Sequence, residues 1–205
     1  MTGNEIANMY EFSYGAIKRN LDDVTNEESL VQPPGAGNCL NWVLGHIVVA
    51  RNTILSLAGG APTVGDEVAA HYRRGSEPLQ PGDKVPDLAT LRGLLSDTQH
   101  QLVPALAALS DEALALPVPE QMRRPPLTGS VADALIRLHY HEGYHNGQIG
   151  LLRRLAGKEG GDQVRRYAGR DLARLWLGMV RRVECATPRS SFPFRLPTTA
   201  SEPCR

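Results

Sequence analysis

Four segments of about 20 residues carry apolar side chains at helical spacing, and no other feature of the sequence constrains the fold as strongly. Stretches rich in proline and glycine separate them, so each segment predicts one long amphipathic helix. Because such helices bury their apolar stripes against one another, we expect an all-α fold, a four-helix bundle. The long link between the second and third helices would let the chain cross the bundle. The predicted helices cover residues 4–24, 38–58, 87–109 and 130–157.

Capping residues mark where two of these helices begin. Asn38 or Asn41 would cap the second helix. Ser130, with Asp133 three residues later, resembles a capping box before the fourth helix. Pro104 is expected to bend the third helix, because proline removes one backbone hydrogen bond.

The sequence changes character after the fourth helix. We expect one domain over residues 1–158 and a basic extension over 159–205. Residues 1–163 hold 13 Lys/Arg against 19 Asp/Glu, whereas the rest of the chain holds 9 Arg against 3 acidic residues. An apolar stripe over 164–183 predicts an amphipathic fifth helix, packed on the bundle or on a second subunit. Residues 187–205 show no periodicity and are expected to be disordered.

The composition is that of a globular protein, with 41% hydrophobic and 21% charged residues. The chain shows no signal peptide and no apolar run long enough to span a membrane. Its three cysteines, Cys39, Cys185 and Cys204, are an odd number and too far apart for a zinc knuckle. We therefore expect a cytoplasmic protein with no membrane partner. Nothing in the acidic body argues for nucleic-acid binding, so we expect no specific nucleic-acid partner, and a homodimer is left open.

Three histidines lie in apolar helical segments. His141 and His145 are four residues apart, so they share one face of the fourth helix, the face of its apolar stripe. A buried imidazole needs a hydrogen-bond partner or a metal. His46, at the edge of the apolar face of the second helix, would complete a site of three imidazoles. Its alternative is a core histidine bonded to a backbone carbonyl. His139 lies roughly 200° around the helix from His141 and should face elsewhere.

Three protein ligands are typical of a catalytic zinc site, whereas structural zinc usually has four. A set of three imidazoles suits a divalent metal ion such as Zn, Ni, Fe or Cu. Among neighbouring side chains, we expect Glu142 at the surface, with a role as base as the alternative. We expect Gln148 in an interhelical hydrogen bond, with orientation of a bound water as the alternative. Cys39 is expected to be a small buried residue rather than part of the site.

Two motifs resemble those of the DinB superfamily of bacterial proteins: NWVLGHIVVAR, which contains His46, and HYHEGYHNGQIGLLRRLAGK, which contains His141 and His145. The segments YRRGSEPL and LSDEAL are also similar to the family, and the resemblance covers about residues 4–158. It implies a four-helix bundle with a long second connection. It also implies that the three histidines are the metal ligands.

The resemblance implies function only broadly, because some members transfer or isomerise low-molecular-weight thiols and others are described as metal-dependent hydrolases. We expect a metal-dependent enzyme acting on a small molecule, a low-molecular-weight thiol among the options, with its catalytic residues beyond the metal ligands unassigned. The alternative is a non-catalytic stress-response binding protein whose metal holds the helices together. A cleft with polar groups such as Tyr72 or Arg73 would favour the enzyme, and a sealed apolar site the alternative.

Overall fold

The computed structural model of this chain describes residues 1–35, 37–80, 82–125 and 127–161. The helix predicted over 164–183 and the disordered tail predicted over 187–205 lie outside these residues, so both remain predictions.

Every secondary-structure element of the described residues is a helix, apart from two isolated β-bridges, which confirms the predicted all-α fold. The short elements lie in the predicted links, which are too short of regular apolar spacing for a helix to be predicted there. None of the described helices is both long and apolar enough to cross a membrane. The long helices are α1 (Gly3–Leu21), α3 (Leu40–Leu57), α5 (Leu88–Ala107) and α7 (Val131–Leu155). The short ones are α2 (Asn26–Ser29), α4 (Asp66–Tyr72), α6 (Asp111–Ala115) and the 3₁₀ turn η1 (Glu120–Met122).

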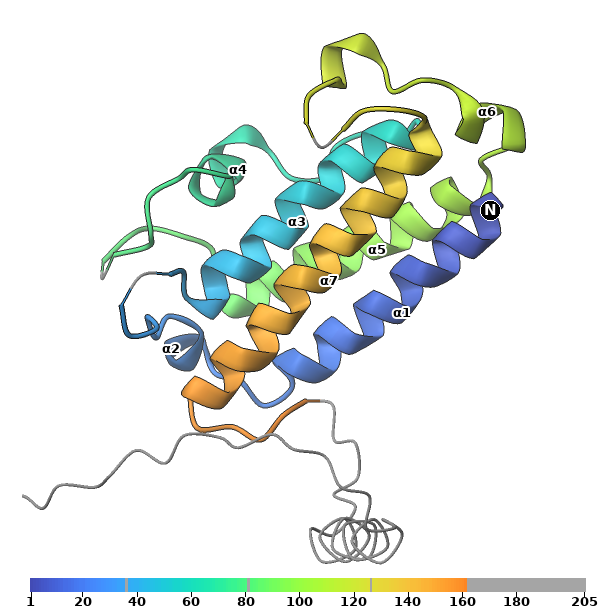
Figure 1. Cartoon of the computed structure of the whole chain (residues 1–205). Coiled ribbons are helices and arrows are strands. Elements are labelled where there is room, and N and C mark those ends of the chain that lie inside the picture. Colours follow the sequence, from blue (N-terminus) through green and yellow to red (C-terminus); the bar gives the residue numbers. More distant parts are fainter. Residues whose placement is uncertain (36, 81, 126, 162–205) are drawn as a thin grey trace, which may run out of the picture. The chain divides into compact units, whose positions relative to one another are not determined.

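The four long helices lie side by side, and each packs against two others. Helices α1 and α3 each contact both α5 and α7. In Figure 1, α7 lies between α3 and α1, and α5 lies behind them. Their apolar faces enclose two clusters of buried side chains, one containing Leu44 and Leu91 and the other containing Leu102 and Leu135. Helix α4, in the long connection after α3, packs back onto α3, and its Tyr72 belongs to the first of these clusters.

The ends of the helices match the sequence signals in part. Ser130 and Asp133 form the predicted capping box at the start of α7. The prediction that Asn38 or Asn41 caps α3 was wrong, because the cap is Cys39, which makes no side-chain capping bond. Asn41 lies within the first turn and is fully buried, so its side chain binds neighbouring segments instead. Pro104 lies inside α5, close to its carboxyl end.

Candidate metal centre

The structure brings together the three histidines that the sequence singled out. His46 lies on α3, and His141 and His145 lie on α7. The Nε2 atom of His141 is 3.2 Å from that of His46 and 3.1 Å from that of His145. All three ligand atoms lie within 4.8 Å of one another. Two nitrogens bound at about 2.1 Å to one ion are roughly 3.0–3.4 Å apart at angles of about 90–109°. Two of the three pairs thus have the spacing of ligands to one ion, and the third pair must lie within about 4.2 Å for one ion to bind all three imidazoles.

Hydrogen bonds on the far side of two rings fix which nitrogen faces the centre. His46 Nδ1 lies 2.6 Å from the carbonyl oxygen of Tyr72, which only accepts, so Nδ1 carries the proton. His145 Nδ1 likewise donates to Oε1 of Gln148 at 2.7 Å. The Nε2 atoms of His46 and His145 therefore both point a lone pair toward Nε2 of His141. A neutral His141 can donate only one proton there, so at least one of the two lone pairs has no hydrogen. Such an excess of lone pairs fits a cation, and partners of this kind are typical of metal-ligating histidines.

Burial keeps these imidazoles neutral. Desolvation lowers the pKa of His46 and of His145 below their usual range. The pKa of His141 is lowered to about 4, first by burial and then by the neighbouring charges of His145 and His46. At neutral pH all three side chains are therefore unprotonated at one nitrogen, which is the state that ligates a metal.

Several residues around His46 contact Tyr72, the last residue of α4. A Cβ on Gly45 would lie 2.4 Å from the Tyr72 ring, so only glycine lets that ring pack against α3. Asn41 accepts a hydrogen bond from the Tyr72 hydroxyl at 3.0 Å. Trp42 stacks on the His46 ring, with centroids 5.0 Å apart and planes 8° from parallel. The segment NWVLGHIVVAR thus binds α4 against α3, and the Tyr72 carbonyl in turn orients His46.

A buried ion pair joins two residues that are close in sequence to the histidines, Arg51 and Glu142. Arg51 is fully buried and binds both carboxylate oxygens of Glu142 at 2.9 Å. Arg51 also donates to Gln99 Oε1 on α5 at 2.9 Å, and the Ser13 hydroxyl on α1 donates to Glu142. The network therefore joins all four long helices.

The expectation that Glu142 lies at the surface was wrong, because only 2% of it is exposed. Glu142 is turned away from the face of His141, but that side of α7 packs on α1 rather than facing solvent. Sequence reasoning also missed Arg51, although a single arginine in an otherwise apolar helix is a signal that it needs a buried carboxylate.

Three further side chains can be compared with expectation. Gln148 binds His145 on its own helix, so the predicted interhelical bond was wrong. Cys39 is fully buried among apolar side chains, as expected, and burial raises the pKa of its thiol. His139 faces α1, with Nε2 at 3.1 Å from the Met9 carbonyl oxygen, as its helical position predicted.

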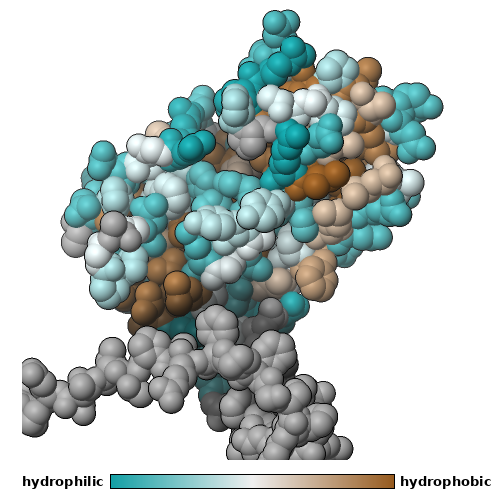
Figure 2. Space-filling model, viewed as in Figure 1, coloured by the Kyte–Doolittle hydropathy of each residue, from teal (hydrophilic) through white to brown (hydrophobic). Residues whose placement is uncertain are grey.

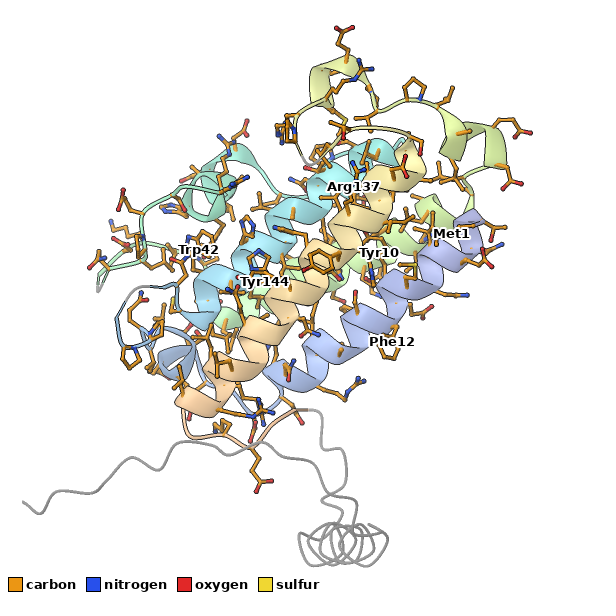
Figure 3. The ribbon with its side chains drawn as sticks, viewed as in Figure 1. Met1, Tyr10, Phe12, Trp42, Arg137 and Tyr144 are labelled. Atoms are coloured by element: carbon orange, nitrogen blue, oxygen red, sulfur yellow. The ribbon has the colours of Figure 1, made fainter. Side chains whose placement is uncertain are left out.

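The three histidines line a cleft of about 1110 Å³. Its walls come from α3 and α7, from the segment before α3, and from the loops that follow α4 and η1. Trp42 on α3 and Tyr144 on α7 both line it and are labelled in Figure 3. On this face of the molecule, hydrophobic residues gather near the carboxyl end of α7, and hydrophilic ones cover α4 and its following loop (Figure 2). Of the two polar groups expected here, Arg73 lines the cleft, whereas the buried Tyr72 contributes its carbonyl.

Comparisons with known proteins bear on both the fold and the family. A search of curated proteins found no match. The fold is similar to that of a conserved protein from Enterococcus faecalis, seen in a crystal structure, with a TM-score of 0.58 and 16% sequence identity. That similarity covers 76% of this chain and 98% of the other, and at this identity it shows the fold alone. A family model of the DinB superfamily matches residues 9–149, well over half of the sequence. The chain therefore belongs to the DinB superfamily.

Proposed function

We propose that this protein is a metal-dependent enzyme on a four-helix bundle, in which His46, His141 and His145 bind one divalent ion. Its reaction is transfer of a low-molecular-weight thiol or hydrolysis of a small molecule. The observation that carries the proposal is the convergence of three Nε2 atoms on a cleft rather than on a sealed apolar core. A divalent ion there would polarise a thiol or a water molecule and lower its pKa.

The residues around the centre support an open catalytic site. The described residues that line the cleft include no aspartate, glutamate or cysteine, so nothing there supplies a fourth protein ligand of the kind that closes structural zinc sites. The Tyr72 carbonyl and Gln148 hold the rings of His46 and His145. The competing function, a non-catalytic binding protein with a structural metal, predicts a closed site instead.

Metal titration followed by activity assays tests this proposal. The full chain is stripped with a chelator, and binding of Zn²⁺, Ni²⁺ and, without oxygen, Fe²⁺ is measured by calorimetry and elemental analysis. About one ion per chain is expected. His141→Ala should abolish binding, while His139→Ala, on the same helix but facing α1, should bind normally. Undiminished metal content in His141→Ala would contradict the site.

The activity assays separate the two reaction classes. The metal-loaded protein is given a small thiol with an aryl halide, and separately a nitrophenyl ester. Turnover that disappears with the chelator and in His141→Ala supports the enzyme. Stoichiometric metal binding without turnover of any thiol or ester would favour the structural alternative.

A further inference from the structure

We propose that the cleft takes an anionic, partly apolar small molecule whose carboxylate or phosphate group is bound by Arg74 and Arg124. This inference rests on the proposed function, because it names the class of substrate for that same site. Three observations carry it: the positive charge of the cleft lining, the absence of side-chain partners for these two arginines among the described residues, and the apolar surface beyond the histidines.

The lining of the cleft is positively charged, although the body of the protein is acidic. The described residues that line it include Arg73, Arg74 and Arg124 and no carboxylate. Residues 1–163 as a whole hold 19 acidic against 13 basic side chains. The described acidic residues therefore lie outside the cleft lining. A cleft with one sign of charge and low-dielectric walls concentrates the field that attracts an anion.

Two of these arginines are free to bind a ligand. Arg73 already pairs with Asp66 at 2.7 Å. Among the described residues, the side chains of Arg74 and Arg124 make no hydrogen bond or ion pair, and both are exposed. Arg74 lies close enough to His141 for its charge to act on that imidazole. A guanidinium offers a planar pair of donors that matches a carboxylate or phosphate, so these two groups suit an oxyanion bound in the cleft.

The rest of the cleft is apolar and long. On α7 the lining extends from Leu138 past the histidines to Leu155, which is about 25 Å along the helix. Leu151 and Leu155 expose about half of their surface, 56% and 50%, although they are large and apolar. Arg124 belongs to the loop before α7, at the opposite end from these two leucines. A ligand with an anionic end and an apolar body would therefore cover both regions while its middle lies over the histidines.

A pair of fluorescent probes tests the charge requirement. Anilinonaphthalenesulfonate is an apolar anion, and N-phenylnaphthylamine has the same rings without the sulfonate. Binding of each is measured on metal-free protein at about pH 8, where the histidines are neutral. Arg74→Gln combined with Arg124→Gln should weaken the anionic probe about tenfold, the effect of losing two exposed charge pairs, and leave the neutral probe unchanged. Lys18→Gln on α1 removes one charge outside the cleft and should change neither.

The same experiment has clear contrary results. Equal weakening of both probes would show that the arginines act through shape, and no weakening of the anionic probe would show that they do not bind the anion. Either overturns the inference. Because the protein is metal-free, these results do not depend on whether the histidines bind metal.

Displacement of the anionic probe then separates the two sources of oxyanion. Octanoate, octyl phosphate and octanol have apolar chains of nearly equal length and differ in the head group. We expect either anion to displace the probe at a concentration about tenfold lower than octanol, and the double variant to remove that difference. The better of the two anions identifies the head group. Equal displacement by all three from the wild type would contradict the subsite.

Discussion

Arg51 and Glu142 form a two-point ion pair that water does not reach, with side chains only 0% and 3% exposed. Nε and Nη2 of the guanidinium each donate to a separate carboxylate oxygen at 2.9 Å. Glu142 directly follows His141 on α7, and Arg51 lies one and a half turns after His46 on α3. The pair thus ties together the two helices that carry the histidines.

Replacing Glu142 by glutamine should destabilise the protein by about 3–5 kcal/mol, because Arg51 would be left as a buried, uncompensated charge. Chemical denaturation of the metal-free protein measures this. Adding Arg51→Met should recover a large part of the loss, because a buried pair replaced by apolar side chains is often tolerated. A loss of less than about 1 kcal/mol in the free energy of unfolding of Glu142→Gln would mean that water solvates the Arg51 guanidinium.

Gly45→Ala should lower metal affinity about tenfold or more, because its Cβ would displace the Tyr72 ring and with it the carbonyl that holds His46. Calorimetric titration with Zn²⁺ measures the change. Gly143→Ala is the matched control. Gly143 lies between His141 and His145 on α7, and a Cβ there would meet nothing within 4 Å. That control should keep its affinity and gain about 0.5–1 kcal/mol of stability. Equal affinity in both variants would disprove the role of Tyr72.

Gln148→Leu should also reduce metal affinity, by about 10-fold to 100-fold, because His145 loses the acceptor that fixes its Nδ1 proton. Gln148 is only half-buried at the cleft, so the melting temperature of the metal-free protein should barely change. Gln148→Glu, which keeps an acceptor oxygen, should retain most of the affinity. Similar losses in both variants would show that Gln148 does not act through this hydrogen bond.

The metal-free protein should lose stability as the pH falls below about 6.5, the usual pKa of histidine in an unfolded chain. Above that pH His141 is neutral in both states. Below it His141 is protonated in the unfolded chain, whereas in the folded protein it stays neutral down to its lowered pKa of about 4. The contribution of His141 is therefore complete above 6.5 and lost on the way down to 4. Melting curves of wild type and His141→Gln check this, and the variant should fall less steeply; parallel curves would contradict it.

Local patterns in the sequence predicted much of the fold and of the site. The long helices follow from apolar periodicity, and the common direction of His141 and His145 follows from their spacing of one turn. That His46 joins them is a matter of tertiary packing: its place in an apolar helix left a core histidine as the alternative, and the resemblance to the DinB superfamily favoured the metal site. Metal binding itself stays a prediction.

Other parts of the site could not be read from the sequence, for physical reasons. The Glu142 side chain points about 100° away from that of His141, and the angle alone does not distinguish solvent from another helix. Glu142 is buried because α7 packs on both α1 and α3, where Ser13 and Arg51 bind its carboxylate. The acceptor for His46 is a backbone carbonyl, a group that every residue carries, so nothing in the identity of Tyr72 reveals its role.

Helix α4 contributes none of the three grouped histidines, yet the carbonyl of its last residue, Tyr72, holds His46. Docking of this seven-residue helix and capture of an ion at the three histidines are therefore thermodynamically linked, and the linkage is reciprocal. An ion at the centre would slow hydrogen exchange of the Asp66–Tyr72 amides, and anything that lifts α4 from α3 would release the ion. The long connection between α3 and α5 is in that sense a latch on the centre.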